Sequence, residues 1–314
     1  MNPGPVVARF AGRAMGSPLR LTTVGLPPAA ARRAWRLVVA DVELTEGALS
    51  RWRAESSLSR LNAVAGSGEW VIAERRLYLA LSASARAQRL TDGRFDPRVI
   101  ARLEALGERA GVPLPEGSVE WDEPWLQRDP RHQAVRLAAP VDSGGIGKGL
   151  AVRWAVDRLT RAGLAGDGLL LEAGGDLFAR GRPPEGSGWR IGIEDPETDG
   201  DPLAVIEIDG GAVVTSSTAV RHWTAPGGGA VHHLIDPATG APGGDGLVAV
   251  TALATDPAWA EVWSKALFLA GPGRIADEAR ARGFAAWWVE GDRSLHMTPA
   301  ARAVTIWTTQ DRAA

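Results

Sequence analysis

Short strand patterns joined by tight glycine turns fill the second half of this chain and limit the folds that it can adopt. The apolar run at 169–171 leads into a Gly-Gly turn at 174–175, and the glycine turn at 209–211 predicts a hairpin leading into 212–214. Hairpin turns join antiparallel strands, whereas parallel neighbours need long crossover connections. Helical patterns lie between the groups of strands. The sequence therefore predicts an α+β fold with antiparallel sheets and helices packed on them.

Hydrophobic periodicity and turn residues place the remaining elements. The pattern at 10–24 predicts a strand pair interrupted at Met15-Gly16-Ser17. Strands are also predicted at 133–141, 169–171, 189–193, 203–208, 212–214, 232–240, 247–254 and 285–289, and helices at 28–49, 74–90, 99–106, 150–161, 257–270 and 274–282 with a short one ending near 62. No long linker or internal repeat is evident, so we expect a single domain over residues 1–314. The stretch 107–132, rich in Gly, Pro and charge, is expected to be a variable surface excursion.

Composition excludes several classes of function. The formal net charge of the 314 residues is −2, which argues against a nucleic-acid binder driven by bulk charge. The chain has no cysteine, so disulfides, thiolate catalysis and cysteine-ligated zinc are excluded. No apolar run approaches the length of a membrane span, and the first nine residues lack the apolar core of a signal peptide. We therefore expect a cytoplasmic protein without direct membrane insertion.

The segment Asp142-Ser-Gly-Gly-Ile-Gly-Lys148-Gly is a glycine-rich turn between a predicted strand and a predicted helix. Four glycines within six positions let the backbone approach another molecule closely, and amides at a helix start favour anions. The spacing differs from that of a Walker A loop, and no Ser or Thr follows the lysine. Two interpretations remain open at this point, a structural turn and an anion site. The acid that opens the run and the lysine near its end favour the anion site.

Lysine is rare in this chain. Lys148 and Lys265 are the only lysines in the sequence, and all other basic side chains of the Lys and Arg total are arginines. Lys265 follows Glu261 by four residues on the helix predicted to begin at Asp256-Pro257. One interpretation is an ordinary helix-surface ion pair. The apolar residues around this face favour a chemical role, because an ammonium and a guanidinium are not interchangeable.

The segment His232-His233-Leu-Ile-Asp236-Pro is the main candidate for acid–base chemistry. It follows the strand-end motif Thr215-Ser216-Ser217 by about fifteen residues. An imidazole beside a carboxylate can act as a general base, so His233 and Asp236 are candidates. The alternative is an Asp-Pro turn with an exposed histidine. Adjacent histidines on a strand point to opposite faces, which argues against a shared metal ion.

Taken in order, these motifs resemble the ApbE family of FAD:protein FMN transferases. The matching segments are Ala14–Ser17, Ser50–Asn62, Thr91–Pro97, Asp142–Gly149, Ala173–Asp176, Thr215–Ser217, His233–Pro237 with Thr239-Gly240, and Ala260–Leu267. The resemblance implies a T-fold-like α+β architecture. It also implies an enzyme that cleaves FAD, attaches FMN through a phosphodiester to a threonine of a client flavoprotein, and releases AMP, with Mg²⁺ assisting.

The resemblance also implies the site residues. The FAD-binding set would be Met15, Trp52, Arg94, Phe95, Asp96, Asp142, Lys148, Thr215, Ser216, His233, Leu234 and Lys265. The catalytic set would be His233, Asp236 and Lys148, with His233 near the reaction centre. The candidate metal ligands are a backbone carbonyl near Gly145 and the carboxylate of Glu261.

The predicted helix at 257–270 departs from the family pattern. The family carries an Asp and, four residues later, a Thr that both hold Mg²⁺, and this chain has Glu261 and Lys265 there. An ammonium cannot ligate a cation, so we hypothesise that Lys265 takes over part of the cation's role, oriented by Glu261. Two alternatives to the transferase remain open. One is an FAD pyrophosphatase, and the other is a flavin-binding protein that has lost catalysis.

Overall fold

The computed structural model describes residues 5–108, 124–196 and 201–309. The chain forms two compact units, and each is described by itself. The first unit consists of Met1–Val42, Lys148–Val220 and Gly244–Ala314, and the second of Glu43–Gly147 and Arg221–Gly243. A single domain over 1–314 stays a prediction. Most of the excursion predicted at 107–132 lies outside the described residues.

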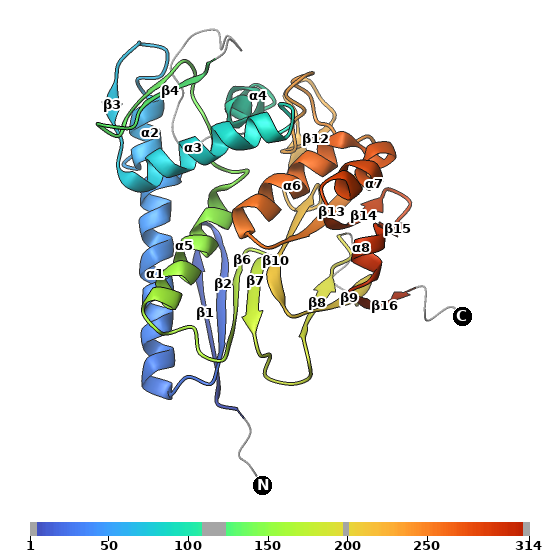
Figure 1. Ribbon diagram of the computed structural model, residues 1–314. Coiled ribbons are helices and arrows are strands. Elements are labelled where there is room, and N and C mark those ends of the chain that lie inside the picture. The colour runs from blue at the N-terminus through green and yellow to red at the C-terminus, as the bar shows by residue number, and fades with distance from the viewer. Residues whose placement is uncertain (1–4, 109–123, 197–200, 310–314) are drawn as a thin grey trace. The chain divides into compact units, whose positions relative to one another are not determined.

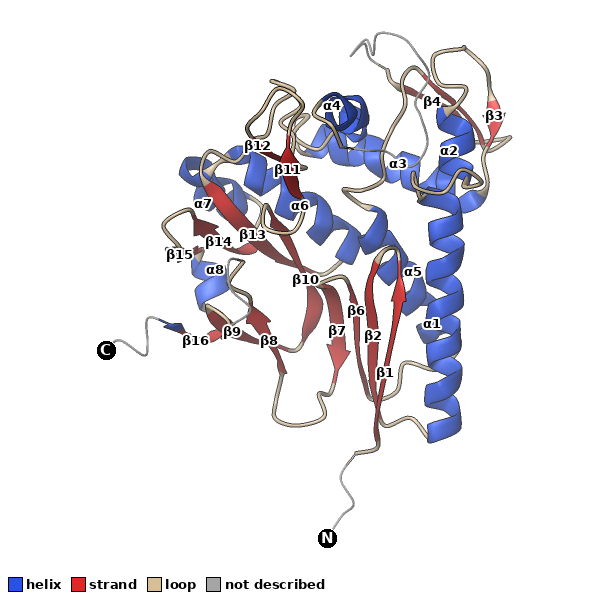
Figure 2. Ribbon diagram, turned by 180° about the vertical axis from the view of Figure 1, so that it is seen from behind, coloured by secondary structure: helices blue, strands red, loops and turns tan. Residues whose placement is uncertain are grey.

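A large antiparallel sheet forms the centre of the first unit (Figures 1 and 2). Among the described residues its strand order is β1-β2-β6-β7-β10-β13-β14-β15, and each neighbouring pair is antiparallel. The strands are β1 (Val7–Ala14), β2 (Ser17–Val24), β6 (Gly168–Ala173), β7 (Asp176–Gly181), β10 (Gly210–Ser217), β13 (Leu247–Ala254), β14 (Ala285–Glu290) and β15 (Leu295–Met297). The predicted α+β class with antiparallel sheets is confirmed.

Helices cover one face of this sheet. They are α1 (Pro28–Leu49), which continues into the second unit, α5 (Gly147–Arg161), α6 (Pro257–Ala270) and α7 (Pro272–Ala281). The short helix α8 (Pro299–Arg302) lies on the opposite face, where Ala301 joins the buried cluster of the smaller sheet. Alternate side chains of β2 and β6, such as Leu21 and Leu171, are buried against Val38 of α1 and Leu159 of α5. The alternate side chains of the strands and the apolar faces of α1 and α5 therefore pack together in one core.

A smaller sheet packs on the other face. It has the order β16-β9-β8, formed by β16 (Thr305–Thr308), β9 (Ala204–Ile208) and β8 (Trp189–Ile193). Ile191 and Ile206 from this sheet share a buried cluster with Val213 and Trp287 from the large sheet. The large sheet therefore buries apolar side chains on both faces.

Two sequence predictions about local structure in the first unit are confirmed. The interruption at Met15 and Gly16 is a two-residue hairpin turn between β1 and β2, with φ values of 51° and 70°. Such left-handed pairs are typical of hairpin turns that match strand twist. Helix α6 begins at Pro257, and the Asp256 carboxylate accepts hydrogen bonds from the backbone N–H groups of Ala258 and Trp259.

The hairpin predicted at 209–211 is wrong. β9 pairs with β8 and β16 in the small sheet, whereas β10 pairs with β7 and β13 in the large one. Gly210 and Gly211 are already strand residues, and Gly211 has a φ of 127°. The glycines therefore carry the chain from one sheet to the other. β9 pairs with β8, and its buried side chains pack against the large sheet, which local turn residues cannot reveal.

The second unit has two small sheets, β3-β5-β4 and β11-β12, among its described residues. Its elements are α2 (Ser57–Asn62), β3 (Val71–Ile72), α3 (Arg75–Leu90), the 3₁₀ helix η1 (Pro97–Val99), α4 (Ile100–Ala105), β4 (Leu126–Asp129), β5 (Ala134–Leu137), β11 (His222–Thr224) and β12 (Ala230–His232). The strand predicted at 232–240 is wrong beyond His232. Pro237 has no amide to donate, and the N–H of Gly240 donates to the Asp236 carbonyl at 2.8 Å, so a turn forms. Within the described ranges, no helix has the length and apolar character of a membrane span.

Candidate functional site

Lys148 lies in the first turn of α5 and forms a short ion pair. Its Nζ lies 2.6 Å from Oδ2 of Asp176, the first residue of β7. The Asp176 side chain is 4% exposed, while that of Lys148 is 31% exposed. The turn from β6 to β7 directly precedes Asp176. Its residues Gly174 and Gly175 have φ values of 63° and 88°, which glycine adopts without strain. The predicted turn at 173–176 therefore delivers the carboxylate that positions the lysine.

Glu261 on α6 is fully buried and lies beside the second lysine. Its Oε2 accepts a hydrogen bond from the backbone N–H of Gly149 at 2.8 Å, and its Oε1 lies 3.5 Å from Nζ of Lys265. Burial raises the pKa of Glu261, while the Lys265 ammonium opposes this rise and the Asp176 carboxylate adds to it. Two lysines and two carboxylates thus form one cluster in the first unit, which we call the lysine cluster (Lys148, Asp176, Glu261 and Lys265).

Gly149 sets the distance between α5 and α6. A Cβ atom at Gly149 would lie 2.4 Å from the carbonyl oxygen of Pro257. We expect Gly149→Ala to destabilise the protein by about 1–3 kcal/mol, because the two backbones would have to separate. Guanidinium unfolding measures this loss. The matched control is Gly47→Ala in α1, where a Cβ meets no atom within 4 Å and the added methyl should stabilise the helix slightly. Equal stability of the two variants would contradict the close approach.

Two hydroxyl groups of β10 bond to neighbouring elements, one to α6 and one to β13. Ser216 is 3% exposed, and its Oγ lies 2.8 Å from Oγ of Ser264, which donates to the Glu261 carbonyl at 3.0 Å. Thr215 pairs with Thr251 of β13, with 2.8 Å between the hydroxyl oxygens. Ser216 therefore helps to hold the helix that carries Glu261 and Lys265.

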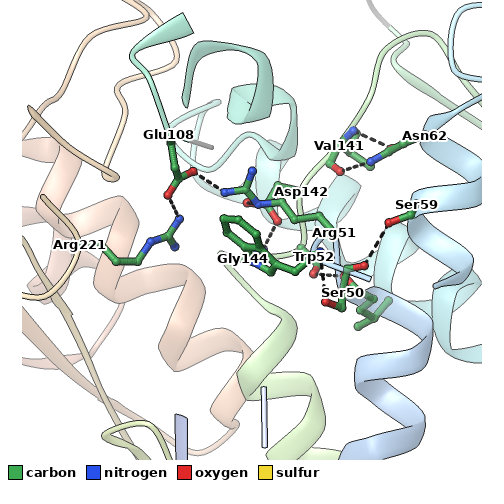
Figure 3. A network of polar contacts seen from close by, with 12 residues as sticks. Ser50, Arg51, Trp52, Ser59, Asn62, Glu108, Val141, Asp142, Gly144 and Arg221 are labelled. Carbon is green, nitrogen blue, oxygen red and sulfur yellow. Dashed lines mark hydrogen bonds and ion pairs between the residues drawn. The ribbon is translucent and has the colours of Figure 1, made fainter. Parts of the chain in front are cut away.

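An arginine network organises the second unit around Trp52 (Figure 3). The Arg51 side chain is 3% exposed, pairs with Glu108, and lies 3.4 Å from Oδ2 of Asp142. Arg221 also pairs with Glu108. The Arg51 guanidinium carbon lies 4.3 Å from the Trp52 ring centroid, while Trp52 itself is 52% exposed. A buried cation thus supports an exposed indole ring that is free to stack on a planar ligand.

Asp142 anchors the beginning of the glycine-rich segment in the second unit. Its Oδ1 accepts the N–H of Gly144 at 3.0 Å, and its own N–H donates to the Pro97 carbonyl at 2.7 Å (Figure 3 shows the first contact). The N–H of Gly147 donates to the Ser143 carbonyl at 2.7 Å, which starts α5. The segment with Gly145 is therefore an ordered turn anchored by the predicted acid.

Phe95 and Asp96 are buried and take part in local structure. Phe95 is 5% exposed, and Asp96 pairs with Arg98 at 2.6 Å and accepts a hydrogen bond from Gln88 at 2.9 Å. Asp96 also caps η1 by accepting the N–H of Arg98 at 2.9 Å. The hydrogen bond from Gln88 ties Asp96 to α3, whereas the ion pair with Arg98 stays within η1 and its cap.

His233 and Asp236 each contact the backbone. Nδ1 of His233 lies 3.3 Å from the Arg221 carbonyl, and Oδ1 of Asp236 accepts the N–H of Ala238 at 2.9 Å. Leu234 between them is 3% exposed. Asp236 therefore stabilises the Asp-Pro turn. Its role beside His233 as a catalytic pair stays a prediction, as does the assignment of the other site residues.

Sequence reasoning missed four residues that hold these sites together. Asp176 lay within a recognised glycine motif but was not assigned a role. Arg51 stands next to Trp52, which a search for buried cations beside candidate aromatic residues could have found. Glu108 and Arg221 carried no local signal, because their partners lie far away in the sequence.

Nearly the whole sequence resembles known proteins of one family. The ApbE family matches residues 15–288. The chain is 27% identical to an FAD:protein FMN transferase of Klebsiella pneumoniae, covering 92% of this chain and 85% of the relative. It is 30% identical to one of Treponema pallidum, covering 78% and 73%.

Solved structures agree with this assignment. The ApbE protein of Thermotoga maritima superposes with a TM-score of 0.80 at 26% identity, covering 95% of this chain and 99% of that one. The apo flavinyl transferase ApbE of Pseudomonas stutzeri gives a TM-score of 0.79 at 26% identity, covering 96% and 98%. With the family match extending over most of the sequence and the same fold in both structures, the chain belongs to the ApbE family.

Proposed function

We propose that this protein is an FAD:protein FMN transferase that modifies a threonine of a client flavoprotein. The observation that carries the proposal is the lysine cluster. It places two partly exposed ammonium groups in front of two buried carboxylates, next to the start of α5. A helix start with nearby cations favours a bound phosphate group. The names of the relatives support FAD as the donor of that phosphate.

The reaction balances without a further reactant. The client threonine hydroxyl attacks the phosphorus of the FMN half of FAD and forms a new P–O bond. The P–O bond to the bridging oxygen breaks, and AMP leaves with that oxygen while the hydroxyl proton passes to a base. Negative charge grows on the leaving AMP phosphate, so a nearby ammonium stabilises the transition state. Lys148, whose head is held by Asp176 at 2.6 Å, is the group that we assign to this role.

Residues of the second unit have the chemistry for the other tasks. Trp52 exposes an indole ring that can stack on the flavin ring, and the Arg51 guanidinium lies over that indole ring and helps to hold it. His233 has an imidazole that can accept the hydroxyl proton. These roles are part of the proposal, and a cytoplasmic location stays a prediction from the sequence.

An incubation with FAD and a threonine-containing client peptide tests the proposed activity. We expect a mass gain of one FMN phosphodiester on the threonine, with AMP released in equal amount. A peptide with alanine in place of the threonine is the control and should gain no mass. AMP and free FMN without peptide labelling would identify a pyrophosphatase instead. FAD retained without turnover would identify a flavin-binding protein.

A further inference from the structure

The lysine cluster separates its charges by depth. The Glu261 side chain is fully buried and that of Asp176 is 4% exposed, whereas Lys265 is 18% exposed and Lys148 31% exposed. The carboxylates therefore lie behind the ammonium groups. Seen from solvent, the cluster presents positive charge, although its four formal charges cancel. An anion with two adjacent negative groups is the complementary ligand.

The residues of the cluster do not fit a magnesium ion. Mg²⁺ requires near-octahedral oxygen ligands at about 2.0–2.1 Å, and the ammonium of Lys265 offers only N–H donors. One oxygen of Glu261 already accepts the Gly149 N–H at 2.8 Å, and the other faces Lys265 at 3.5 Å. In the part of the chain that the structure describes, no group of three or more His, Asp or Glu side chains is arranged to hold a metal ion. Where the family pattern has a metal-holding hydroxyl, this chain has the amino group of a lysine.

The packing of α5 against α6 holds the Lys265 ammonium in place. Lys265 lies one turn after Glu261 on α6, and Glu261 is fixed to α5 through Gly149, the residue that follows Lys148. The two ammonium groups therefore extend from two helices joined by one hydrogen-bonded carboxylate. Removal of that carboxylate would release both helices from this contact. Glu261 is a positioning residue for Lys265 rather than a metal ligand.

Resting on the proposed function, we infer that Lys265 and Lys148 together bind the diphosphate of FAD and that this chain binds FAD without a divalent cation. Each ammonium carries three N–H donors that can reach phosphate oxygens, and each has a buried carboxylate behind it that holds its position. The Lys265 ammonium supplies the positive charge that Mg²⁺ supplies elsewhere in the family. The departure at 261 and 265 thus exchanges a metal for a second lysine.

FAD titrations in EDTA and in MgCl₂, followed by calorimetry, test the inference. The unmodified protein is expected to bind FAD equally well in both. Lys265→Met should weaken FAD binding by about 10- to 100-fold, because a charge-assisted contact to phosphate is lost. Riboflavin, which lacks phosphate, should show no such loss. The matched control is Arg274→Met, which removes a cation from another i,i+4 pair, the exposed contact with Glu278 on α7, and should change nothing.

Two further variants keep the test decisive if Lys265→Met folds poorly. Glu261→Gln with Lys265→Met removes both charges, keeps an acceptor for the Gly149 N–H, and should still lose FAD affinity. Glu261→Asp with Lys265→Thr restores the family pair and should bind FAD weakly in EDTA and more tightly with Mg²⁺. Tight FAD binding by the unmodified protein only when Mg²⁺ is present would overturn the inference and leave the transferase proposal intact. Absence of FAD binding under both conditions would contradict both the inference and the transferase proposal.

Discussion

Replacing Lys148 with methionine is expected to lower kcat/KM for FMN transfer by about 10²–10³-fold, the usual loss when one preorganised donor to a developing negative charge is removed. The ammonium lies at the start of α5, where the helix dipole adds to its effect, and Asp176 fixes it at 2.6 Å. Methionine keeps the length of the side chain without its charge. The measurement is the initial rate of labelling of a threonine peptide at varied FAD concentration.

Two controls separate this loss from misfolding. Arg161→Met removes an exposed cation from the last turn of the same helix and should leave the rate unchanged. Lys148→Met combined with Asp176→Asn also removes the buried carboxylate that would otherwise lose its partner. The double variant should be more stable than the single one and equally slow. A single variant that transfers FMN at the parental rate would exclude Lys148 from the reaction.

Arg51→Met is expected to destabilise the second unit by about 3–5 kcal/mol, because the nearly buried carboxylate of Asp142 loses this cation and Glu108 keeps only its pair with Arg221. The side chains of Glu108 and Asp142 are each 10% exposed, and Arg51 is 3% exposed. The cation–π contact between Arg51 and the Trp52 ring is lost as well. Guanidinium unfolding followed by far-ultraviolet circular dichroism measures the change.

The neighbouring Arg53 provides the matched control for this prediction. It is 44% exposed, pairs with Glu55 at 3.0 Å, and lies 3.8 Å from Glu46. Exposed pairs contribute little, so Arg53→Met should change the free energy of unfolding by about 0.5 kcal/mol or less. Similar losses of unfolding free energy in the two variants would mean that the Arg51 network contributes no more to stability than an exposed ion pair.

Local sequence signals predicted the elements that depend on local physics. The interruption of the strand pair at Met15-Gly16 and the start of α6 at Asp256-Pro257 are set by a few adjacent residues, and the structure has both. The error at 209–211 has a different origin. Whether β9 pairs with β10 or with β8 depends on apolar side chains distant in sequence, and a glycine turn is compatible with either.

The candidate sites divide in the same way. The rarity of lysine favours a chemical role for Lys148 and Lys265, and the structure places both beside carboxylates. The Arg51 network has no local sequence signal, because Glu108 lies 57 residues after Arg51 and 113 residues before Arg221. No motif spans such separations. Long-range ion pairs of this kind become visible only when the fold has brought the chain segments together.

The two lysines of this sequence both belong to one small cluster, and this gives the protein a built-in spectroscopic probe. Isotopic labelling of lysine alone would produce side-chain ammonium signals from Lys148 and Lys265 and from no other residue. Each signal would report on the protonation and hydrogen bonding of its own nitrogen. Binding of a dinucleotide could then be followed directly at these two nitrogen atoms. The arginine side chains would give no signal, because they are not labelled.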